Sequence, residues 1–188
     1  MVTAAPGEER SPALALVNTR RLNAGGEVDD LAEPHAAARW LHLSPASLAA
    51  DDLSRITDLR AAVRELLAAL TEDRAPDAAA LETVNAAARA DAAAPQLTWP
   101  SGPHREWRST QPGSLSEALA ALARDAIEVV TSDLGHLVRP CEAHGCARFF
   151  VREHARRRWC STTCGDRVRA ARHQRLVVEQ RESAQGRS

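Results

Sequence analysis

The sequence predicts a mainly α-helical protein, in which a helical N-terminal domain with a small β-hairpin precedes a compact module that contains all four cysteines. Three observations predict this fold class. The hydrophobic content of 44% comes mostly from Ala and Leu, which have high helix propensity. Apolar residues recur at spacings of three and four in long segments before position 138, which indicates amphipathic helices. The cysteines all lie between positions 141 and 164, beyond those segments.

Basic and acidic residues are distributed unequally along the chain. Residues 1–138 contain 12 Arg and 20 acidic residues, a formal charge of 12 − 20 = −8, whereas residues 139–188 contain 12 Arg and 5 acidic residues, 12 − 5 = +7. The net charge of −1 therefore conceals an acidic part and a basic part. We predict a helical domain over residues 1–138, a cysteine module over 139–181 and a disordered tail over 182–188.

Five helical segments are predicted in the first domain. They cover residues 12–21, 33–43, 51–73, 76–90 and 114–138. The apolar stripe is clearest in the third segment, where these residues share one helix face: Ile56, Leu59, Val63, Leu66, Leu67 and Leu70. In the last segment, the apolar face continues to Leu134 and Leu137.

Turn and capping signals mark several ends of these segments. Gly25 and Gly26 mark the end of the first helical segment, and Pro45 ends the second. Ser114 followed by Glu117 fits a capping box at the start of the last segment.

A β-hairpin is predicted between the fourth and fifth helical segments. The short alternating runs QLTW (96–99) and REWRS (105–109) flank the turn PSGP (100–103). We expect Trp99 and Trp107 to pack in the core rather than to form a ligand platform.

The N-terminal segment MVTAAPGEERSPALALVN predicts a cytoplasmic protein. It carries acidic residues where a secretory signal needs basic ones, and its apolar run is too short for a membrane segment. In a reducing compartment, clustered cysteines favour a metal site over disulfides.

The cysteines form two close pairs, Cys141 with Cys146 and Cys160 with Cys164, separated by thirteen residues. Two such pairs joined by a short connector are typical of one tetrahedral Zn²⁺ ion bound by two thiolates from each pair. Four thiolates fill the coordination shell, so we expect a structural ion and not a catalytic one. Four unrelated free cysteines, or a nuclease with a second metal on His or Asp, are less favoured alternatives.

The residues around the cysteines predict how the two pairs meet. ARFFVRE (147–153) is typical of a strand with Phe149 facing inward, and HARRRW (154–159) of a turn and a returning strand. Ser161 is expected to cap a following helix that carries Cys164 in its first turn. A knuckle, a hairpin and a helix with the last ligand make a treble-clef-like zinc module.

Arginines are concentrated around and after the second cysteine pair. Candidate DNA-binding residues are Arg156, Arg157, Arg158, Arg167, Arg169, Arg172, His173 and Arg175. The planar guanidinium group forms two hydrogen bonds to a phosphate and stays charged at any relevant pH. All 24 basic residues are Arg and none is Lys, which is typical of a GC-rich genome, so a solvated basic face remains an alternative.

The segment RRRWCSTTCGDRVRAARHQR closely resembles the CGNR zinc finger, whose hallmark is Trp-Cys-Ser, then Cys-Gly-Asn-Arg and an Arg-His pair. The matching residues are Trp159, Cys160, Ser161, Cys164, Gly165, Arg167, Arg172 and His173. Asp166 stands at the position of the family Asn, and the stretch between Cys160 and Cys164 is slightly shorter than usual. An acidic residue there repels phosphate, so Asp166 is expected to pair with a neighbouring Arg or to cap the helix.

The first domain is similar to the ABATE domain, which precedes this finger in bacterial proteins described as stress-induced transcription regulators. The resemblance is carried by ALALVNTR, LRAAVRELLAAL and ALETVNAAARA. Asn18 and Thr19 match the "NT" element of that family, and Asn85 resembles a later Asn. The resemblance implies that these three residues line the pocket of a small-molecule effector. Helix capping and satisfaction of buried backbone groups are alternative roles.

The resemblance implies a zinc-containing transcription regulator that binds double-stranded DNA. The acidic domain would sense an effector or mediate association, for example as a homodimer. Two alternatives remain open: a zinc-stabilised protein-interaction module that binds an acidic partner, and an RNA-binding protein. No enzyme is expected, because the sequence contains no nucleophile and base pair, no paired carboxylate motif and no Gly-rich phosphate loop.

Overall fold

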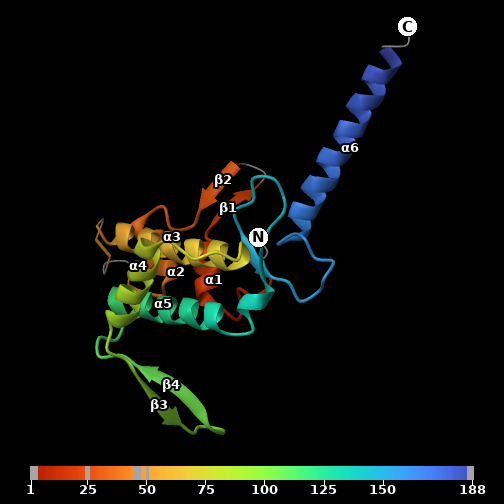
Figure 1. The fold of residues 1–188 in the computed structure, drawn as a ribbon. Coiled ribbons are helices and arrows are strands. Elements are labelled where there is room, and N and C mark those ends of the chain that lie inside the picture. Colours follow the sequence, from red (N-terminus) through yellow and green to blue (C-terminus); the bar gives the residue numbers. More distant parts are fainter. Residues whose placement is uncertain (1–3, 24–25, 45–47, 50, 186–188) are drawn as a thin grey trace.

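The structure is a computed structural model that describes residues 4–23, 26–44, 48–49 and 51–185. Two segments project from a helical body: a β-hairpin and the C-terminal helix (Figure 1). The helices are α1 (Pro12–Val17), α2 (Pro34–Trp40), α3 (Asp52–Thr71), α4 (Ala78–Arg89), α5 (Leu115–Thr131), the 3-10 turn η2 (Gly135–Leu137) and α6 (Thr162–Gln185). Among the described residues, three antiparallel pairs are formed by β1 (Arg20–Asn23) with β2 (Gly26–Asp29), β3 (Ala94–Thr98) with β4 (His104–Arg108), and β5 (Val138–Pro140) with β6 (Phe149–Val151).

The core of the body lies where α1 packs against α3 and α5. Leu14 and Leu16 of α1 are almost fully buried, as are Ile56, Leu59 and Val63 of α3. Each such side chain contributes about 1.5–3 kcal/mol by leaving water. The apolar stripe predicted for residues 51–73 therefore faces this core, with Leu70 at its edge.

Side-chain caps confirm the helix starts predicted at Pro12 and Ser114. The Oγ of Ser11 accepts a hydrogen bond from the Leu14 amide at 3.1 Å, with Pro12 in the first turn of α1. The Oγ of Ser114 accepts from the amide of Glu117 at 3.1 Å, and the Glu117 carboxylate accepts from the Gly113 amide at 2.6 Å. The Ser114 half of the predicted capping box is thus present at the start of α5, whereas Glu117 binds the amide of Gly113 in place of that of Ser114.

The first predicted helix, 12–21, is too long. α1 ends at Val17, and the chain then forms β1 and β2, in which Arg20 pairs with Asp29 and Asn23 with Gly26. The hairpin is polar, with Arg20 ion-paired to Glu27, so it has no apolar alternation that would have predicted strands. The predicted breaks at Gly25 and Pro45 lie outside the described residues.

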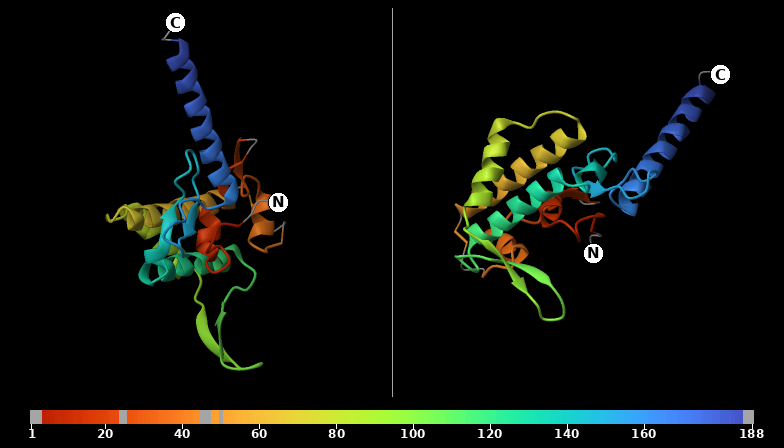
Figure 2. Two further views of the ribbon diagram at one scale, coloured as in Figure 1. Left: turned by 90° about the vertical axis from the view of Figure 1, so that its right-hand side faces the viewer. Right: turned by 60° about the horizontal axis from the view of Figure 1, so that its bottom comes forward.

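The β3–β4 hairpin is present where it was predicted, but its tryptophans are not in the core. Trp99 is 68% exposed and Trp107 is 50% exposed. The reason is that the hairpin projects from the body instead of lying on it, as Figures 1 and 2 show.

The helix predicted to continue to residue 138 ends at Thr131. A Cβ atom at Gly135 would lie 2.6 Å from the carbonyl oxygen of Val129, so only glycine permits the chain to turn back here. As a result Leu137 is 41% exposed, whereas Val138 enters the core as the first residue of β5.

The β-hairpin of the cysteine module is formed by a different pair of strands from the one predicted. β6 pairs with β5, which precedes Cys141, and not with residues 154–159. Residues 154–157 form a turn, and the amide of Glu142 donates to the carbonyl of Arg158 at 3.1 Å. Phe149 faces inward as predicted, into the core of the helical body.

Helix α6 continues to Gln185, past the predicted module end at 181. Residues 182–185 of the predicted disordered tail are therefore helical, and residues 186–188 lie outside the described part of the chain. Within the described residues, we find no helix with the length and apolar character needed to span a membrane.

Candidate metal centre

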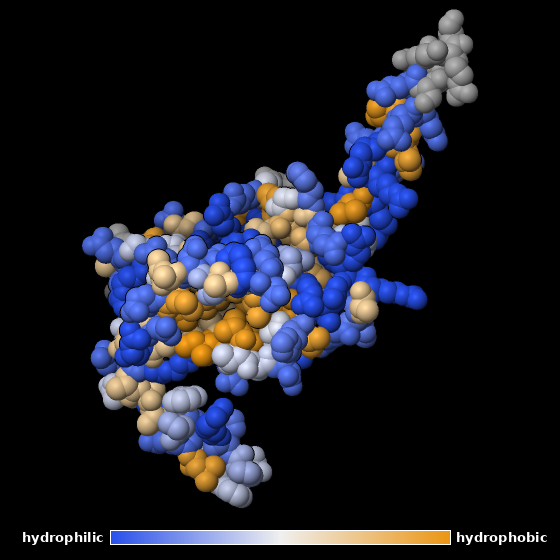
Figure 3. Space-filling model, in the orientation of Figure 1, coloured by the Kyte–Doolittle hydropathy of each residue, from blue (hydrophilic) through white to orange (hydrophobic). Residues whose placement is uncertain are grey.

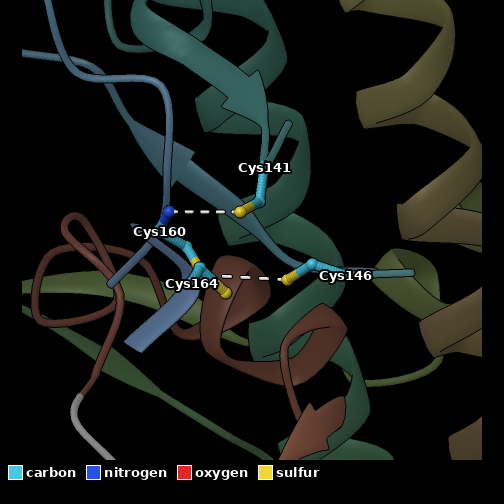
Figure 4. Close-up of side chains that lie close together, drawn as sticks. All are labelled: Cys141, Cys146, Cys160 and Cys164. Atoms are coloured by element: carbon cyan, nitrogen blue, oxygen red, sulfur yellow. Dashed lines mark hydrogen bonds between the residues drawn. The ribbon is translucent and has the colours of Figure 1, made fainter. Parts of the chain in front are cut away.

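Four structural elements position the cysteines (Figure 4). β5 ends just before Cys141, and the turn that follows places Cys146 before β6. Cys160 follows the 154–157 turn, and Cys164 lies in the first turn of α6. The Oγ of Ser161 accepts from the Cys164 amide at 3.2 Å, so the predicted cap fixes the last ligand position.

The sulfur atoms form a cluster of the size that one zinc ion requires. All four Sγ atoms lie within 4.8 Å of one another. The Cys146 and Cys160 sulfurs are 3.8 Å apart, and those of Cys160 and Cys164 are 3.7 Å apart. Zn–S bonds of about 2.3 Å in a tetrahedron place the sulfurs roughly 3.8 Å apart. The distances are much longer than a disulfide bond.

The thiols perturb one another strongly. Cys141 accepts hydrogen bonds from the thiols of Cys146 and Cys160, which lowers its pKa. The same interactions, together with burial, raise the pKa of Cys160. The cluster thus favours a thiolate at Cys141 and opposes ionisation of Cys160. A divalent cation is needed to hold all four sulfurs as thiolates, and the site can hold one zinc ion.

A small apolar cluster surrounds the sulfurs and is separate from the main core. It contains Ala5, Ala143 and Phe150 together with three of the cysteines, and Trp159 and Val168 pack against it. A Cβ atom at Gly165 would lie 3.1 Å from the Trp159 ring, so glycine lets this ring lie close to the first turn of α6.

The eight candidate DNA-binding residues divide into two groups. Three donate to carbonyl or carboxylate groups nearby: Arg157 to the Trp159 carbonyl, Arg158 to Glu142, and Arg167 to the His144 carbonyl. Arg169 forms an ion pair with Asp166. The other four, Arg156, Arg172, His173 and Arg175, are exposed on the turn or on α6.

Asp166 is therefore one of the charged groups that shape this surface. Its carboxylate accepts a hydrogen bond from Arg169, three residues later on α6. The expectation that Asp166 pairs with a neighbouring Arg is confirmed. Both side chains are more than 60% exposed, so the pair contributes little to stability.

Two family models match the chain. The model described as "Putative stress-induced transcription regulator", ABATE, matches residues 10–133, more than half of the chain. The chain belongs to the ABATE family. The CGNR zinc finger model matches residues 138–175, so both resemblances are confirmed. Neither is an enzyme family. No curated protein matches the chain.

The CGNR finger is built into the ABATE domain through β6. Phe149 and Val151 lie in the main core, whereas Phe150 lies in the zinc cluster. The guanidinium group of Arg64 on α3 lies 5.2 Å from the centre of the Phe149 ring and donates to the Ala147 carbonyl. β6 is consequently buried on both of its faces.

The segment before α1 covers the other edge of β6 and the zinc cluster. The carbonyl of Pro6 accepts from the Val151 amide at 2.7 Å, and Ala5 is fully buried beside the cysteines. A Cβ atom at Gly7 would lie 2.2 Å from Cγ2 of Val151, and φ at Gly7 is +99°. The sequence analysis predicted no contact for this segment; the one local signal that could have predicted its turn is the Pro6-Gly7 dipeptide.

Asn18 of the ABATE domain is 3% exposed and bonded to the finger. Its Oδ1 accepts from the Phe149 amide at 2.9 Å, and its Nδ2 donates to the Phe149 carbonyl at 2.8 Å. Nδ2 also donates to Glu8, whose carboxylate accepts from Arg148 at 2.6 Å. These contacts, which sequence reasoning did not find, satisfy buried backbone groups, one of the two alternatives to an effector pocket that were considered for Asn18.

Thr19 lies beside Asn18 in a network between α3 and β2. Its Oγ1 donates to the Leu16 carbonyl and accepts from Arg60 at 2.9 Å. Arg60 also donates to both carboxylate oxygens of Asp29, and these hydrogen bonds lower the pKa of Asp29. Asn18 and Thr19 line a pocket of about 240 Å³.

Asn85 lies far along the chain in α4, and the structure does not bring it to that pocket. It lines a different groove of about 310 Å³ between α3, α4 and α5, with mostly apolar neighbours such as Leu70, Leu81 and Val84. Apolar side chains gather on this face of the body in Figure 3. The three residues that were expected to share an effector pocket thus line two separate hollows.

Proposed function

We propose that this ABATE protein is a cytoplasmic transcription regulator that binds double-stranded DNA through its CGNR finger and α6. The observation that carries the proposal is that α6 extends away from the body with basic side chains exposed along it (Figures 1 and 2). Cys164 ties the first turn of this helix to the cysteine cluster.

The geometry of α6 suits a groove. At 24 residues the helix is about 36 Å long, and a helix of about 10–12 Å diameter fits the major groove of B-DNA. Arg169, Arg172 and Arg175 follow one another at three-residue intervals, so they lie on one side of the helix. Arg156, on the turn before Cys160, adds a charge next to the base of the helix.

The charge distribution supports contact with DNA through the C-terminal part of the chain and not through the ABATE body. The basic residues 139–188 carry α6 and the zinc turn, whereas residues 1–138 have an excess of acids, which disfavours contact between the ABATE body and phosphates. An effector that acts on the ABATE domain, and association into a homodimer, belong to this proposal as its regulatory part.

A salt-titrated binding assay tests the DNA proposal. Zinc-loaded protein is expected to bind duplex DNA with a log–log salt slope of about −5 if six arginines contact phosphates. Arg172→Ala and Arg175→Ala should each weaken binding and reduce the slope by about 1. Arg39→Ala removes the same charge from exposed α2 and should change neither quantity.

The result also discriminates the alternatives. Absent or salt-insensitive binding to duplex DNA by the zinc-loaded protein would refute the proposal. Capture of an acidic protein with the same Arg172 and Arg175 dependence would favour the interaction module, and tighter binding to single-stranded RNA than to duplex DNA would favour an RNA-binding protein.

A further inference from the structure

A pocket of about 470 Å³ lies at the root of the β3–β4 hairpin. It is formed by the end of α4, the two ends of the hairpin and one face of α5. Its lining includes Asp91, Trp107, Glu117, Arg124, Asp125 and Glu128. The metal centre and the basic surface of α6 share none of these residues.

Asp91 is the feature that points to a ligand. The residue is 2% exposed, and its Oδ1 accepts from the hydroxyls of Ser109 at 2.9 Å and Thr110 at 3.3 Å. Its Oδ2 is buried and, among the described residues, has no hydrogen-bond donor. A buried carboxylate oxygen is costly unless it is paired with a donor or a cation.

The surroundings of Asp91 are electrostatically negative. The lining has four acidic residues and two arginines, 2 − 4 = −2. The pocket also lies at the C-terminal end of α4, where a helix dipole favours cations. The cationic side chain of Arg124 already lies at this helix end, where its Nη2 donates to the carbonyls of Ala88 and Asp91.

Trp107 provides an aromatic wall. Its ring is half exposed, and the guanidinium group of Arg124 lies 5.5 Å from the ring centre. The faces of indole rings attract organic cations. Ala93 and Ala121 complete an apolar lining that suits methylene groups.

The acids are spread along the pocket and do not converge on a point. Glu117 and Glu128 lie on the same face of α5, about 16 Å apart along the helix axis. Among the described residues, the cysteines are the one group of His, Cys, Asp and Glu ligand atoms close enough for a metal ion. The arrangement therefore suits an elongated cation with separated charges better than a divalent metal.

We propose that this pocket binds a linear alkylamine of the diamine or polyamine class. One ammonium group lies beside the buried carboxylate of Asp91 and balances its charge, the methylene chain lies against Trp107 and Ala121, and a second ammonium group lies near Glu128. The ligand bridges the hairpin root and α5. This site does not depend on the DNA proposal, because it can be measured in the absence of nucleic acid.

Isothermal titration of the zinc-loaded full-length protein with putrescine and with spermidine, at fixed ionic strength, tests the site. Both amines are expected to bind, and spermidine is expected to bind more tightly. Asp91→Asn should weaken spermidine binding by about tenfold or more, because the negative charge that pairs with the ammonium group is lost. Asp133→Asn removes the same charge from an exposed residue after α5 and should leave the affinity unchanged.

Two further variants keep the test valid if Asp91→Asn fails to fold. Glu128→Gln changes an exposed side chain and should weaken spermidine more than putrescine, because the shorter amine does not reach that end of the pocket. Trp107→Phe should abolish any change of tryptophan fluorescence on binding. Unchanged affinity in folded Asp91→Asn, no binding of either amine, or equally tight binding of Mg²⁺ would overturn the proposal.

Discussion

The side chain of Asn18 acts as a strand partner for β6. Its amide pairs with both backbone groups of Phe149, as a neighbouring strand would do. Without it, the Phe149 N–H and C=O would be buried between α1 and the finger with no partner in that direction. One polar residue in the ABATE domain thus completes the edge of a strand that belongs to the zinc finger.

Asn18→Ala is therefore expected to destabilise the zinc-loaded protein by about 3 kcal/mol, because two buried backbone groups lose their partner. Urea denaturation followed by circular dichroism measures this loss. Asn85→Ala, the same substitution at an exposed position of α4, should change stability by less than about 0.5 kcal/mol. Equal effects of the two substitutions would contradict the role assigned to Asn18.

Asp166→Asn is expected to tighten duplex binding several-fold at low salt. The substitution removes a negative charge from the first turns of α6 and releases Arg169 from its ion pair. Fluorescence anisotropy on labelled duplex DNA measures the change. The gain should disappear in the double variant Asp166→Asn, Arg169→Ala. An affinity that is unchanged or weaker in Asp166→Asn would mean that the carboxylate serves the fold.

At the scale of elements, α6 differs from every helix of the body. Its side chains from Arg169 to Gln180 are almost all exposed, and no apolar stripe runs along this part of the helix. Polar helices without a packed face are marginal in water, and isolated helices of this length depend on their anchored end. Here the anchor is the zinc cluster at Cys164, Trp159 and Val168.

Hydrogen exchange of the free zinc-loaded protein should consequently show decreasing protection along α6. Amides near Cys164 are expected to exchange slowly, and those after His173 quickly. Addition of duplex DNA should protect the second group, since the helix gains a partner surface. Uniform slow exchange along α6 in the free protein would show that the helix is stable without a partner.

An element could be predicted from the sequence when the residues that determine it are local, and could not when a tertiary contact determines it. The start of α6 was predictable because Ser161 and Cys164 carry the cap and the ligand locally. β5 was not, because Leu134 and Leu137 continue a helical spacing, and only the tertiary contact at Gly135 ends it. The exposure of Trp99 and Trp107 was also unpredictable, since two Trp in a hairpin usually indicate a packed face.

The candidate metal centre was predictable from spacing alone, whereas its attachment to the body was not. The four cysteines lie close together in sequence, so their local pattern determines the cluster. The contacts of Pro6 with Val151 and of Asn18 with Phe149 join residues that are distant in sequence. No periodicity or motif in the sequence predicts such long-range contacts.

At the scale of the whole molecule, the finger and the ABATE domain share one core. Val138, Phe149 and Val151 lie among the side chains of α1, α3 and α5. Phe150, between two of these core residues, belongs to the zinc cluster. Loss of the metal must therefore disturb both faces of β6.

Removal of zinc with a chelator is expected to lower the thermal stability of the helical body, with the finger and body melting in one transition in the zinc-loaded protein. Calorimetry and circular dichroism at 222 nm measure this coupling. Metal determination on the same sample should give one zinc per chain. Two separate transitions, with the helical one insensitive to chelation, would contradict a shared core.

The covering of the zinc cluster by residues before α1 has a consequence for biosynthesis. Ala5 and Pro6 are synthesised well before their partners Val151, Cys160 and Cys164. Contacts of such large sequence separation form late and slow folding. The nascent helical body therefore forms before β6 and the cysteine module are in place. Its core is completed only when these segments fold and the metal binds.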